Sequence, residues 1–360
     1  MRVALTLEQC WHRVPGGTAA AALGIARALQ TRTDVEVVGV AAAHKKPAPK
    51  AWRPETPVKH LSLPRVLLYE GWHYLRMPKV ERATGPVDVI HATSLAVPPR
   101  SVPLVVTIHD LAFLHDPDHF TKRGLRFFKR GLELVGREAD LITCPSRATL
   151  DDCISFGLDQ SRLRLVPLGI TPSPATRDAI EHAKTRFALQ DPFVLWVGTI
   201  EPRKNLPRLI RAFSRIEGDV GLVLAGPTGW NQALDELISG DKRIRRIGFV
   251  DRADLDALYA GAAAVCWPSL LEGFGFPVLE AMAQGAAVVS SRGTSTEELV
   301  GDAGLVVDPR DEAEIAGAME KLLADGDLAA ELRAKARDRA ALFTWDRTAE
   351  LLHSAYSEIA

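Results

Sequence analysis

The chain has 360 residues, of which 47% are apolar and 25% charged, and its formal net charge is −1. This length exceeds one ordinary core and favours two domains, and the composition is typical of a soluble globular protein without a nucleic-acid partner. No apolar run reaches the ~18 residues of a membrane span, and the N-terminus lacks a signal-peptide pattern, so we expect a cytoplasmic protein.

The four cysteines are scattered and form no CxxC pair. We therefore expect reduced thiols, with neither a zinc site nor a disulfide framework. Charge is unevenly distributed, because residues 1–170 carry more Lys and Arg than Asp and Glu, and residues 171–360 carry the reverse. A basic first half suits an anionic surface or acceptor, although two differently charged solvated faces would give the same totals.

The first half alternates strand and helix signals. After a loop over Leu7–Gly17, Thr18 is expected to cap an alanine-rich helix that runs to about Gln30. The proline-rich residues 44–64 are expected to be irregular. Strands are predicted at Val3–Thr6, Val35–Val40, Asp88–Ala92, Leu104–Ile108, Ala139–Cys144 and Arg164–Val166.

The second half restarts the pattern with helices near Arg177–Leu189 and Leu206–Ile216. The residues from Asp327 onward have helical periodicity and are long enough to return to the first half. Strands are predicted at Phe193–Val197, Gly221–Ala225, Ile244–Val250, Ala264–Trp267, Ala287–Ser290 and Gly304–Val307. The order favours two α/β domains with parallel sheets that face each other across a cleft.

The stretch Trp267–Ala281, WPSLLEGFGFPVLEA, combines the features of a ligand site. Glu272 and Glu280 flank two glycines, and Pro277 opens a predicted helix. Glycines allow close backbone approach, a helix start attracts phosphate, and carboxylates bind sugar hydroxyls. The stretch indicates a nucleotide-sugar site, and the alternative is an ordinary loop before a helix.

Charged and glycine-rich segments follow other predicted strands, where ligands of parallel sheets bind. Arg203 and Lys204 follow Phe193–Val197 and suit a diphosphate, although such a pair taken alone is usually solvated surface. Gly226 and the segment Gly248–Val250 also end strands, and their backbone groups could hold a flat base.

His109 and Asp110 follow a strand of the first half, in a neighbourhood of three histidines and three aspartates. A metal site is one interpretation, but the spacings match no closed metal pattern, and we favour a sugar or phosphate contact by His109. Gly16 and Gly17 resemble a phosphate-binding turn without Walker spacing. The sequence has neither the dinucleotide G-x-G-x-x-G nor the hydrolase G-x-S-x-G motif.

Thr121–Arg137, TKRGLRFFKRGLELVGR, predicts a basic amphipathic helix. Such a helix could lie on an anionic membrane surface, or it could simply have one core face and one solvated face.

These motifs together resemble the retaining GT-B glycosyltransferases of family 4 over nearly the whole chain. The resemblance rests on the glycine pair before Thr18, on His109-Asp110, on VGTIEPRKN, on the E-x7-E motif within its G-F-G-x-P context and on Thr344-Trp345. The EPRKN form is most similar to bacterial mannosyltransferases that build polysaccharides or glycolipids.

The resemblance implies an N-terminal acceptor-binding domain over residues 1–172, with the C-terminal helix 344–360 returning to it. It implies a nucleotide-sugar-binding domain over residues 173–343. The resemblance implies catalytic roles for His109, Glu272, Arg203 and Lys204. Donor contacts are implied for Gly16, Gly17, Gly198, Thr199, Arg203, Lys204, Asn205, Gly226, Phe249, Val250, Glu272, Gly273, Phe274, Gly275, Leu279 and Glu280.

More specifically, Glu280 would hold the ribose, Glu272 the transferred sugar, and Arg203 with Lys204 the diphosphate, while His109 would reach the donor sugar from the first domain. Many relatives have Arg where this chain has Thr199, which puts the phosphate contacts there in question. Fixed cations and a helix start stabilise a departing diphosphate, so no essential metal or other cofactor is expected.

We therefore expect a retaining hexosyltransferase that moves mannose from GDP-mannose to a lipid-linked or glycan acceptor. It would work in the cytoplasm, with a peripheral contact to the inner face of the plasma membrane as a further hypothesis. A glycosidase-like double displacement by the two glutamates is a rival mechanism. A UDP-sugar epimerase of GT-B fold and a non-catalytic nucleotide-sugar-binding protein remain alternative functions.

Overall fold

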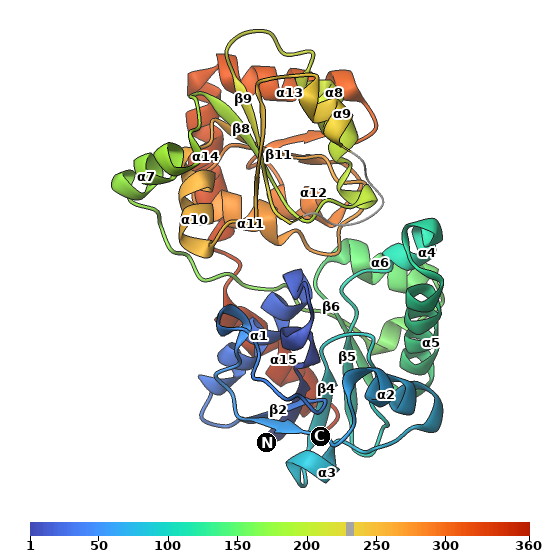
Figure 1. Cartoon of the computed structure of the whole chain (residues 1–360). Helices are drawn as coiled ribbons and strands as arrows, with labels where there is room; N and C mark the ends of the chain where they lie inside the picture. The colour runs from blue at the N-terminus through green and yellow to red at the C-terminus, as the bar shows by residue number, and fades with distance from the viewer. Residues whose placement is uncertain (228–233) are drawn as a thin grey trace. The chain divides into compact units, whose positions relative to one another are not determined.

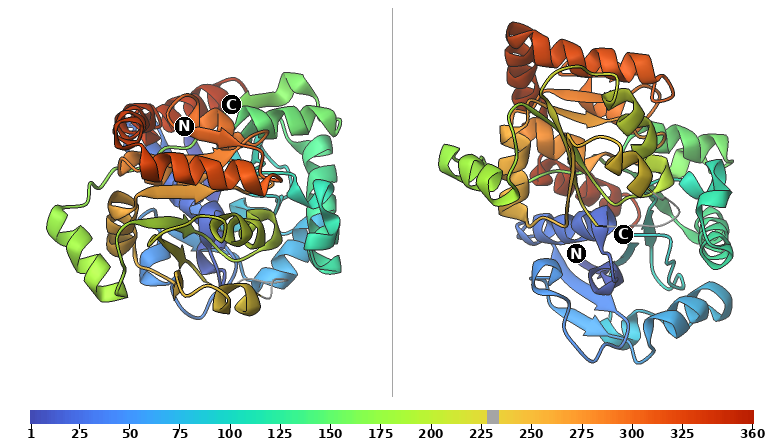
Figure 2. Two further views of the ribbon diagram at one scale, coloured as in Figure 1. Left: turned by 90° about the horizontal axis from the view of Figure 1, so that it is seen from above. Right: turned by 45° about the horizontal axis from the view of Figure 1, so that its top comes forward.

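A computed structural model describes residues 1–227 and 234–360 and divides them into two compact units. The first unit combines Met1–Ile170 with Thr344–Ala360, and the second covers Thr171–Phe343. Each unit has a parallel sheet with helices on both faces (Figures 1 and 2). Strands covered on both faces are continuous apolar runs, as in Phe193–Val197, where all five residues are buried.

The first sheet has seven parallel strands in the order β3-β2-β1-β4-β5-β6-β7. Its strands are β1 (Arg2–Thr6), β2 (Glu36–Ala41), β3 (Val58–His60), β4 (Val89–Ala92), β5 (Leu104–Thr107), β6 (Leu141–Cys144) and β7 (Leu163–Leu165). The helices around it are α1 (Gly16–Gln30), α2 (Arg65–Glu70), α3 (Glu81–Thr84), α4 (Ala112–His115), α5 (Lys122–Glu138), α6 (Arg147–Ser155) and α15 (Trp345–Ser357).

Helix α15, the last helix of the chain, belongs to the first unit and packs against α1 (Figure 1). A Cβ atom added to Gly24 of α1 would lie 2.1 Å from the Trp345 ring, so the glycine permits this close approach. The Tyr356 hydroxyl bonds Nδ1 of the buried His91 at 2.7 Å, which ties α15 to β4. The predicted return of the C-terminal helix is confirmed.

The second sheet has six parallel strands in the order β10-β9-β8-β11-β12-β13. They are β8 (Phe193–Val197), β9 (Gly221–Ala225), β10 (Ile244–Gly248), β11 (Ala264–Trp267), β12 (Val288–Ser291) and β13 (Leu305–Val307). Its helices are α7 (Arg177–Phe187), α8 (Leu206–Phe213), α9 (Asp235–Ser239), α10 (Arg252–Gly261), α11 (Phe276–Ala283), α12 (Ser295–Val300), α13 (Glu312–Ala324) and α14 (Gly326–Ala340).

Both sheets reverse their strand order at an internal point, between β1 and β4 in the first and between β8 and β11 in the second. Open α/β sheets bind ligands outside the carboxyl ends of the strands at such a point. The predicted fold class, two Rossmann-like parallel-sheet domains, is confirmed. The fold therefore directs attention to the loops that follow these four strands.

Two local predictions were wrong. Residues 58–60 form the edge strand β3 within the proline-rich segment. The preceding Pro57 does not disrupt the sheet, because it takes part only through its carbonyl, which accepts a hydrogen bond from the Gly39 N–H at 2.9 Å. Thr18 is the third residue of α1, and its hydroxyl donates to the Pro15 carbonyl at 3.3 Å, so it is not the helix cap. Helix α1 instead begins at Gly16, whose φ of +63° suits glycine.

Candidate functional site

In the second unit, the loops that follow β8 and β11 join through an ionic cluster. Lys204 Nζ lies 2.5 Å from Glu272 Oε1, and an Arg203 nitrogen lies 3.1 Å from Glu272 Oε2. Arg203 also contacts Glu201 at 2.7 Å, so two cations face two carboxylates. The residues predicted for the diphosphate and for the transferred sugar are therefore in direct contact with each other.

The cluster lies on a tryptophan pair. Trp267 donates its indole N–H to Glu272 at 3.0 Å, and the Lys204 ammonium lies 4.9 Å from the centre of the Trp267 ring. Trp267 stacks on Trp196 with the ring centres 5.6 Å apart. Sequence reasoning did not assign a role to Trp267, although it opens the glycine-rich stretch. The indole fixes one Glu272 oxygen while its ring supports the ammonium group.

Burial and charge set the ionisation of the cluster. Burial alone would raise the pKa of Glu272, but Lys204 and Arg203 outweigh it and lower this pKa to about 2. Burial and the neighbouring Arg203 lower the pKa of Lys204, against the opposing effect of Glu272. Glu272 is thus a carboxylate at neutral pH, and an additional anion at this site would favour the charged form of Lys204.

Hydrogen bonds from backbone and amide groups hold the loops after β8 and β11 together. Asn205 adopts a left-handed conformation with φ +59°, and its amide nitrogen donates to the carbonyls of Pro268 at 2.8 Å and Pro309 at 2.6 Å. The Leu270 N–H donates to the Arg203 carbonyl at 2.8 Å. Ser295, from the start of α12, donates to the Glu272 carbonyl at 2.9 Å. Asn205 therefore positions the predicted donor-binding loops.

The glycine-rich turn Gly273–Gly275 leads directly into α11. Gly275 has φ +102°, and a Cβ atom there would lie 2.5 Å from Thr296 Cγ2. Phe274 is buried and packs edge-on against Phe276 at 5.2 Å. Helix α11 begins at Phe276, without a side-chain cap and without an acidic residue in its first turn, and Leu279 faces the core. A helix start of this kind favours an anion.

Glu280 lies on α11 with partners of its own. It forms an ion pair with Arg252 of α10 and accepts a 3.3 Å hydrogen bond from the Tyr259 hydroxyl. Burial raises the pKa of Glu280, and the Arg252 charge opposes this shift only in part. Sequence reasoning missed Arg252 and Tyr259, because no motif connects α10 with the E-x7-E stretch. The two glutamates thus have separate partners and opposite pKa shifts.

Three glycines at the ends of β8, β9 and β10 lie side by side. The Gly226 N–H donates to the Gly248 carbonyl at 2.7 Å, and a Cβ on Gly226 would lie 1.9 Å from the Gly198 carbonyl oxygen. Beyond them, Phe249 is 74% exposed, whereas Val250 is buried and Thr199 is half-buried. The predicted base-side residues therefore share one edge of the sheet, with the Phe249 ring open to solvent.

The predicted residues of the first unit lie at its own strand-order reversal. His109 follows β5, and its Nε2 lies 3.0 Å from the Thr93 carbonyl, which follows β4. Burial lowers the pKa of His109, although the bond to Thr93 opposes this. The imidazole is therefore neutral at pH 7, with Nε2 protonated and Nδ1 available as a hydrogen-bond acceptor. Gln9, not identified from the sequence, donates to the same carbonyl at 3.2 Å.

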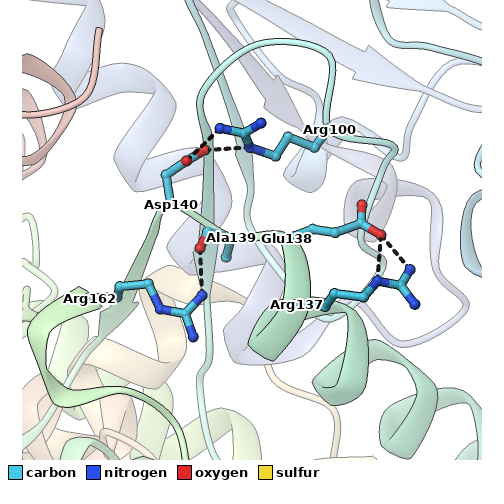
Figure 3. Close-up of a pocket in the computed structure, with 6 residues that line it drawn as sticks. All are labelled: Arg100, Arg137, Glu138, Ala139, Asp140 and Arg162. Atoms are coloured by element: carbon cyan, nitrogen blue, oxygen red, sulfur yellow. Dashed lines mark hydrogen bonds and ion pairs between the residues drawn. The ribbon is translucent and has the colours of Figure 1, made fainter.

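A hollow of about 590 Å³ in the first unit is lined mainly by charged side chains that already form hydrogen bonds (Figure 3). Arg100 bonds Asp140, Arg137 bonds Glu138, and Arg162 donates to the Ala139 carbonyl. Arg100, Asp140 and Arg162 precede β5, β6 and β7, so they lie at the amino ends of these strands. This edge is opposite to the one where parallel sheets bind ligands.

Over residues 1–227 and 234–360, no three His, Cys, Asp or Glu side chains are grouped as a metal ion would require. The histidines and aspartates that follow β5 make other contacts, such as that of His115 with Asp152 at 2.8 Å. In the same part of the chain, no helix is long and apolar enough to cross a membrane.

Comparison with known proteins agrees with this architecture. Residues 15–174 match the family described as Glycosyltransferase Family 4, and residues 178–339 match Glycosyl transferases group 1. O-antigen chain mannosyltransferase B of Escherichia coli is 32% identical over 281 residues, which cover 74% of each chain. Serotype-specific mannosyltransferase WbdA of Escherichia coli is 31% identical over 293 residues, which cover 74% of this chain and 35% of that protein.

Among solved structures, Anabaena Alr3699/HepE in complex with UDP-glucose superposes with a TM-score of 0.78 over 99% of this chain and 100% of that chain. Its 20% sequence identity makes this a likeness of fold. The two family matches and the relative at 32% identity show that this chain belongs to glycosyltransferase family 4, whose members take the transferred sugar from a nucleotide-sugar donor.

Proposed function

We propose that this glycosyltransferase moves mannose from GDP-mannose to a lipid-linked or glycan acceptor, with retention of configuration, during polysaccharide, lipopolysaccharide or glycolipid assembly. The observation that carries the proposal is the cluster of Arg203 with the buried Lys204 and Glu272 at the strand-order reversal of the second sheet. The choice of mannose is supported by the two mannosyltransferase relatives.

In this proposal, Arg203 and Lys204 turn from Glu272 towards the diphosphate when the donor binds, and they are in place before the reaction. Fixed cations stabilise the negative charge that grows on the leaving diphosphate, without reorganisation at the moment of reaction. Glu272, which is ionised, accepts hydrogen bonds from hydroxyls of the transferred sugar, and the α11 start contacts the phosphate. The acceptor proton passes to a diphosphate oxygen on the face from which the diphosphate departs.

Nucleotide contacts are proposed for the remaining predicted residues. Glu280 binds the ribose hydroxyls, held in place by Arg252 and Tyr259. The backbone around Gly198, Gly226 and Val250 holds the base. His109 and the glycine pair of α1 belong to the other unit, and their action on the same donor stays a prediction.

The donor is tested by a thermal-shift screen with GDP, UDP and ADP and their sugars. A ligand that binds only the native state raises the melting temperature, so GDP and GDP-mannose should give the largest shifts. Transfer of labelled mannose to isolated lipid-linked glycans then tests the acceptor. Stabilisation by UDP-sugars with no response to GDP-mannose would overturn the choice of donor while leaving the family assignment intact.

Two incubations separate the alternatives. An epimerase would convert its UDP-sugar without an acceptor, so donor alone should give no isomerised sugar. A non-catalytic binder would bind the donor in calorimetry and transfer nothing. We also propose that no essential metal takes part, because the cations of the cluster provide the charge. Activity that disappears in EDTA and returns with Mn²⁺ would overturn this.

We propose a cytoplasmic enzyme that touches the inner membrane face through α5. The structure places Lys122, Arg126 and Lys129 exposed on this helix, with spacings of four and three residues that bring them to one face. Binding to anionic vesicles at low salt, and no binding to neutral vesicles, is the expected result. Absence of binding to anionic vesicles at low salt would overturn this contact.

A further inference from the structure

Three donors meet the carboxylate of Glu272 in the loop after β11. Its Oε1 lies 2.5 Å from Lys204 Nζ and accepts from the Trp267 indole at 3.0 Å, and its Oε2 accepts from Arg203 at 3.1 Å. In the proposed reaction, the two cations turn to the diphosphate when the donor binds. Glu272 then loses two charged partners and keeps the indole N–H, in the state in which it has to meet the transferred sugar.

The Trp267 indole is fixed on several sides. It is 1% exposed and stacks on Trp196 with the ring centres 5.6 Å apart and the ring planes 16° from parallel. A Cβ atom added to Gly198 would lie 2.8 Å from Cη2 of Trp267, so the ring fills the space that a side chain at position 198 would need. The Ser291 hydroxyl donates to the Trp267 carbonyl at 3.3 Å. The indole therefore cannot follow a cation that moves, and its N–H is a fixed dipole beside the carboxylate.

A fixed N–H matters because both members of the Lys204–Glu272 pair are buried. Each is 8% exposed, so their separation leaves a carboxylate with little access to water. A hydrogen bond from an N–H favours the ionised form of a carboxylate and is stronger than a bond between two neutral groups. The ring face supports the other member of the pair, because the ammonium lies 4.9 Å from its centre. Trp267 therefore makes separation of the pair less unfavourable.

Trp196 shows that the stack itself does not need such a bond. Its indole N–H is equally buried, yet it has no hydrogen-bond partner within residues 1–227 and 234–360. The two rings share their stacking, and the bond to Glu272 belongs to Trp267 alone of the two. The pair of rings thus offers a way to separate the positioning of the carboxylate from the packing around it.

We propose that Trp267 is a positioning residue for the transferred sugar. Its N–H holds the Glu272 carboxylate towards the sugar hydroxyls after Lys204 has turned to the diphosphate. The inference rests on the proposed function and adds to it a residue that acts through Glu272. Loss of the N–H should weaken binding of the nucleotide sugar more than binding of the bare nucleotide, because the bare nucleotide has no hexose for Glu272 to hold.

The N–H is removed in two ways. Trp267→Phe keeps an aromatic ring beside the ammonium, and 3-benzothienylalanine at position 267 keeps the size of the ring and replaces only the N–H by sulfur. Calorimetry measures the affinities for GDP-mannose and GDP, or for whichever nucleotide sugar and nucleotide stabilise the unaltered protein in the thermal-shift screen. A wrong choice of donor base or sugar would therefore fail in that screen and leave this test intact.

The affinity for the nucleotide sugar should fall about tenfold in both variants, because a hydrogen bond to a charged acceptor is lost. The affinity for the nucleotide should change by less than about threefold, since the Lys204 ammonium keeps an aromatic ring beside it. Circular dichroism and the melting temperature check that each variant is folded.

Two matched variants separate positioning from packing. Trp196→Phe makes the same change in the other ring of the stack, and its effect on the nucleotide sugar should be smaller than that of Trp267→Phe. Trp72→Phe removes a buried indole N–H that donates to the Pro78 carbonyl at 3.0 Å in the first unit. This variant should lower the melting temperature and leave the ratio of the two affinities unchanged.

Two results with the sulfur analogue would overturn the inference. If it binds both ligands as the unaltered protein does, Glu272 keeps its position without the N–H. If it weakens both ligands equally, Trp267 acts through Lys204 or through the fold and not through the contact to the sugar. Absence of any nucleotide-sugar binding by the unaltered protein would refute the proposed function itself, and this inference with it.

Discussion

Glu272 and Lys204 are 68 residues apart in sequence, yet their side chains meet at 2.5 Å in a buried cluster. Both are less than a tenth exposed, so neither charge can turn to water for compensation. The two charges therefore compensate each other within the cluster, with Arg203 as a second partner of Glu272, until an anion arrives. Such an arrangement predicts that the cluster contributes both to stability and to transfer.

Lys204→Ala should lower the rate of transfer about 10²–10³-fold, because it removes a cation aimed at the leaving diphosphate. It should also destabilise the fold by roughly 3–5 kcal/mol, because Glu272 loses its closest counter-charge. Transfer assays and urea unfolding measure the two effects. Lys242→Ala, at an exposed lysine of the same unit, is the control and should change neither.

The double variant Lys204→Ala/Glu272→Gln separates stability from catalysis. Removing both charges should recover much of the lost stability without recovering transfer. Wild-type turnover in either Lys204 variant would contradict the proposed site.

Low pH should reduce the free energy of unfolding, because it protonates Glu272 and removes its charge. Its folded pKa of about 2 lies below the ordinary value of 4.5, so its stabilising contribution is complete above the ordinary value and is lost as pH falls towards 2. Urea unfolding over this pH range should show a shallower loss of stability in Glu272→Gln than in the unaltered protein. Equal slopes would mean that Glu272 is not held as a buried carboxylate.

Glu280→Gln should weaken nucleotide binding, because a neutral amide accepts hydrogen bonds from ribose hydroxyls less strongly than a carboxylate. A loss of roughly tenfold in affinity for GDP is expected, with calorimetry as the measurement. Glu320→Gln on α13 is an exposed control without a described contact. Unchanged affinity for the nucleotide in Glu280→Gln would remove the ribose assignment.

His109 should act as a neutral acceptor through Nδ1. Asparagine places an oxygen near the position of Nδ1, whereas glutamine reproduces the Nε2–H donor to the Thr93 carbonyl. His109→Asn should therefore keep more transfer activity than His109→Gln, by about tenfold or more. Because burial lowers the pKa of His109 below its ordinary value of 6.5, protonation of this imidazole should not reduce activity between about pH 7 and 8. The reverse order of the two variants would place the functional nitrogen at Nε2.

Gly275→Ala should destabilise the second unit by about 1–3 kcal/mol, because φ +102° and the contact with Thr296 both oppose a Cβ atom. Thermal unfolding in the presence and absence of GDP measures the loss. Gly317→Ala, within α13 and with open space at the added methyl group, should be neutral or stabilising by up to about 1 kcal/mol. A stable Gly275→Ala variant would show that the turn is not constrained as described.

The fold was largely predictable because most strands are apolar runs bounded by turn residues. Phe193–Val197 lies between Pro192 and Gly198 and was predicted to the residue. Strand β3 was missed because three residues among prolines are too few to show an alternation of apolar and polar side chains. The strand is defined by its pairing with β2. Thr18 failed as a cap because Gly16 can adopt the positive φ that starts the helix two residues earlier.

The residue types of the candidate site were predictable, and their partners were not. The glycine-rich stretch and the Arg-Lys pair each stand out, but the contact between Lys204 and Glu272 arises only because β8 and β11 are neighbours in the sheet. Arg252 binds Glu280 from α10, which carries no motif. Side-chain pairing across separate loops depends on sheet order and rotamers, which one sequence pattern does not specify.

The backbone of Ile170 pairs with that of Thr344 in a parallel bridge, so the chain leaves the first unit and re-enters it at neighbouring points. The second unit is therefore inserted between two segments of the chain that together form the first unit. Neighbouring strands are only about 5 Å apart, so a short glycine link from residue 170 to residue 344 would span the junction. Each unit could then be produced as a separate protein, and the affinity for nucleotide could be measured on residues 171–343 alone.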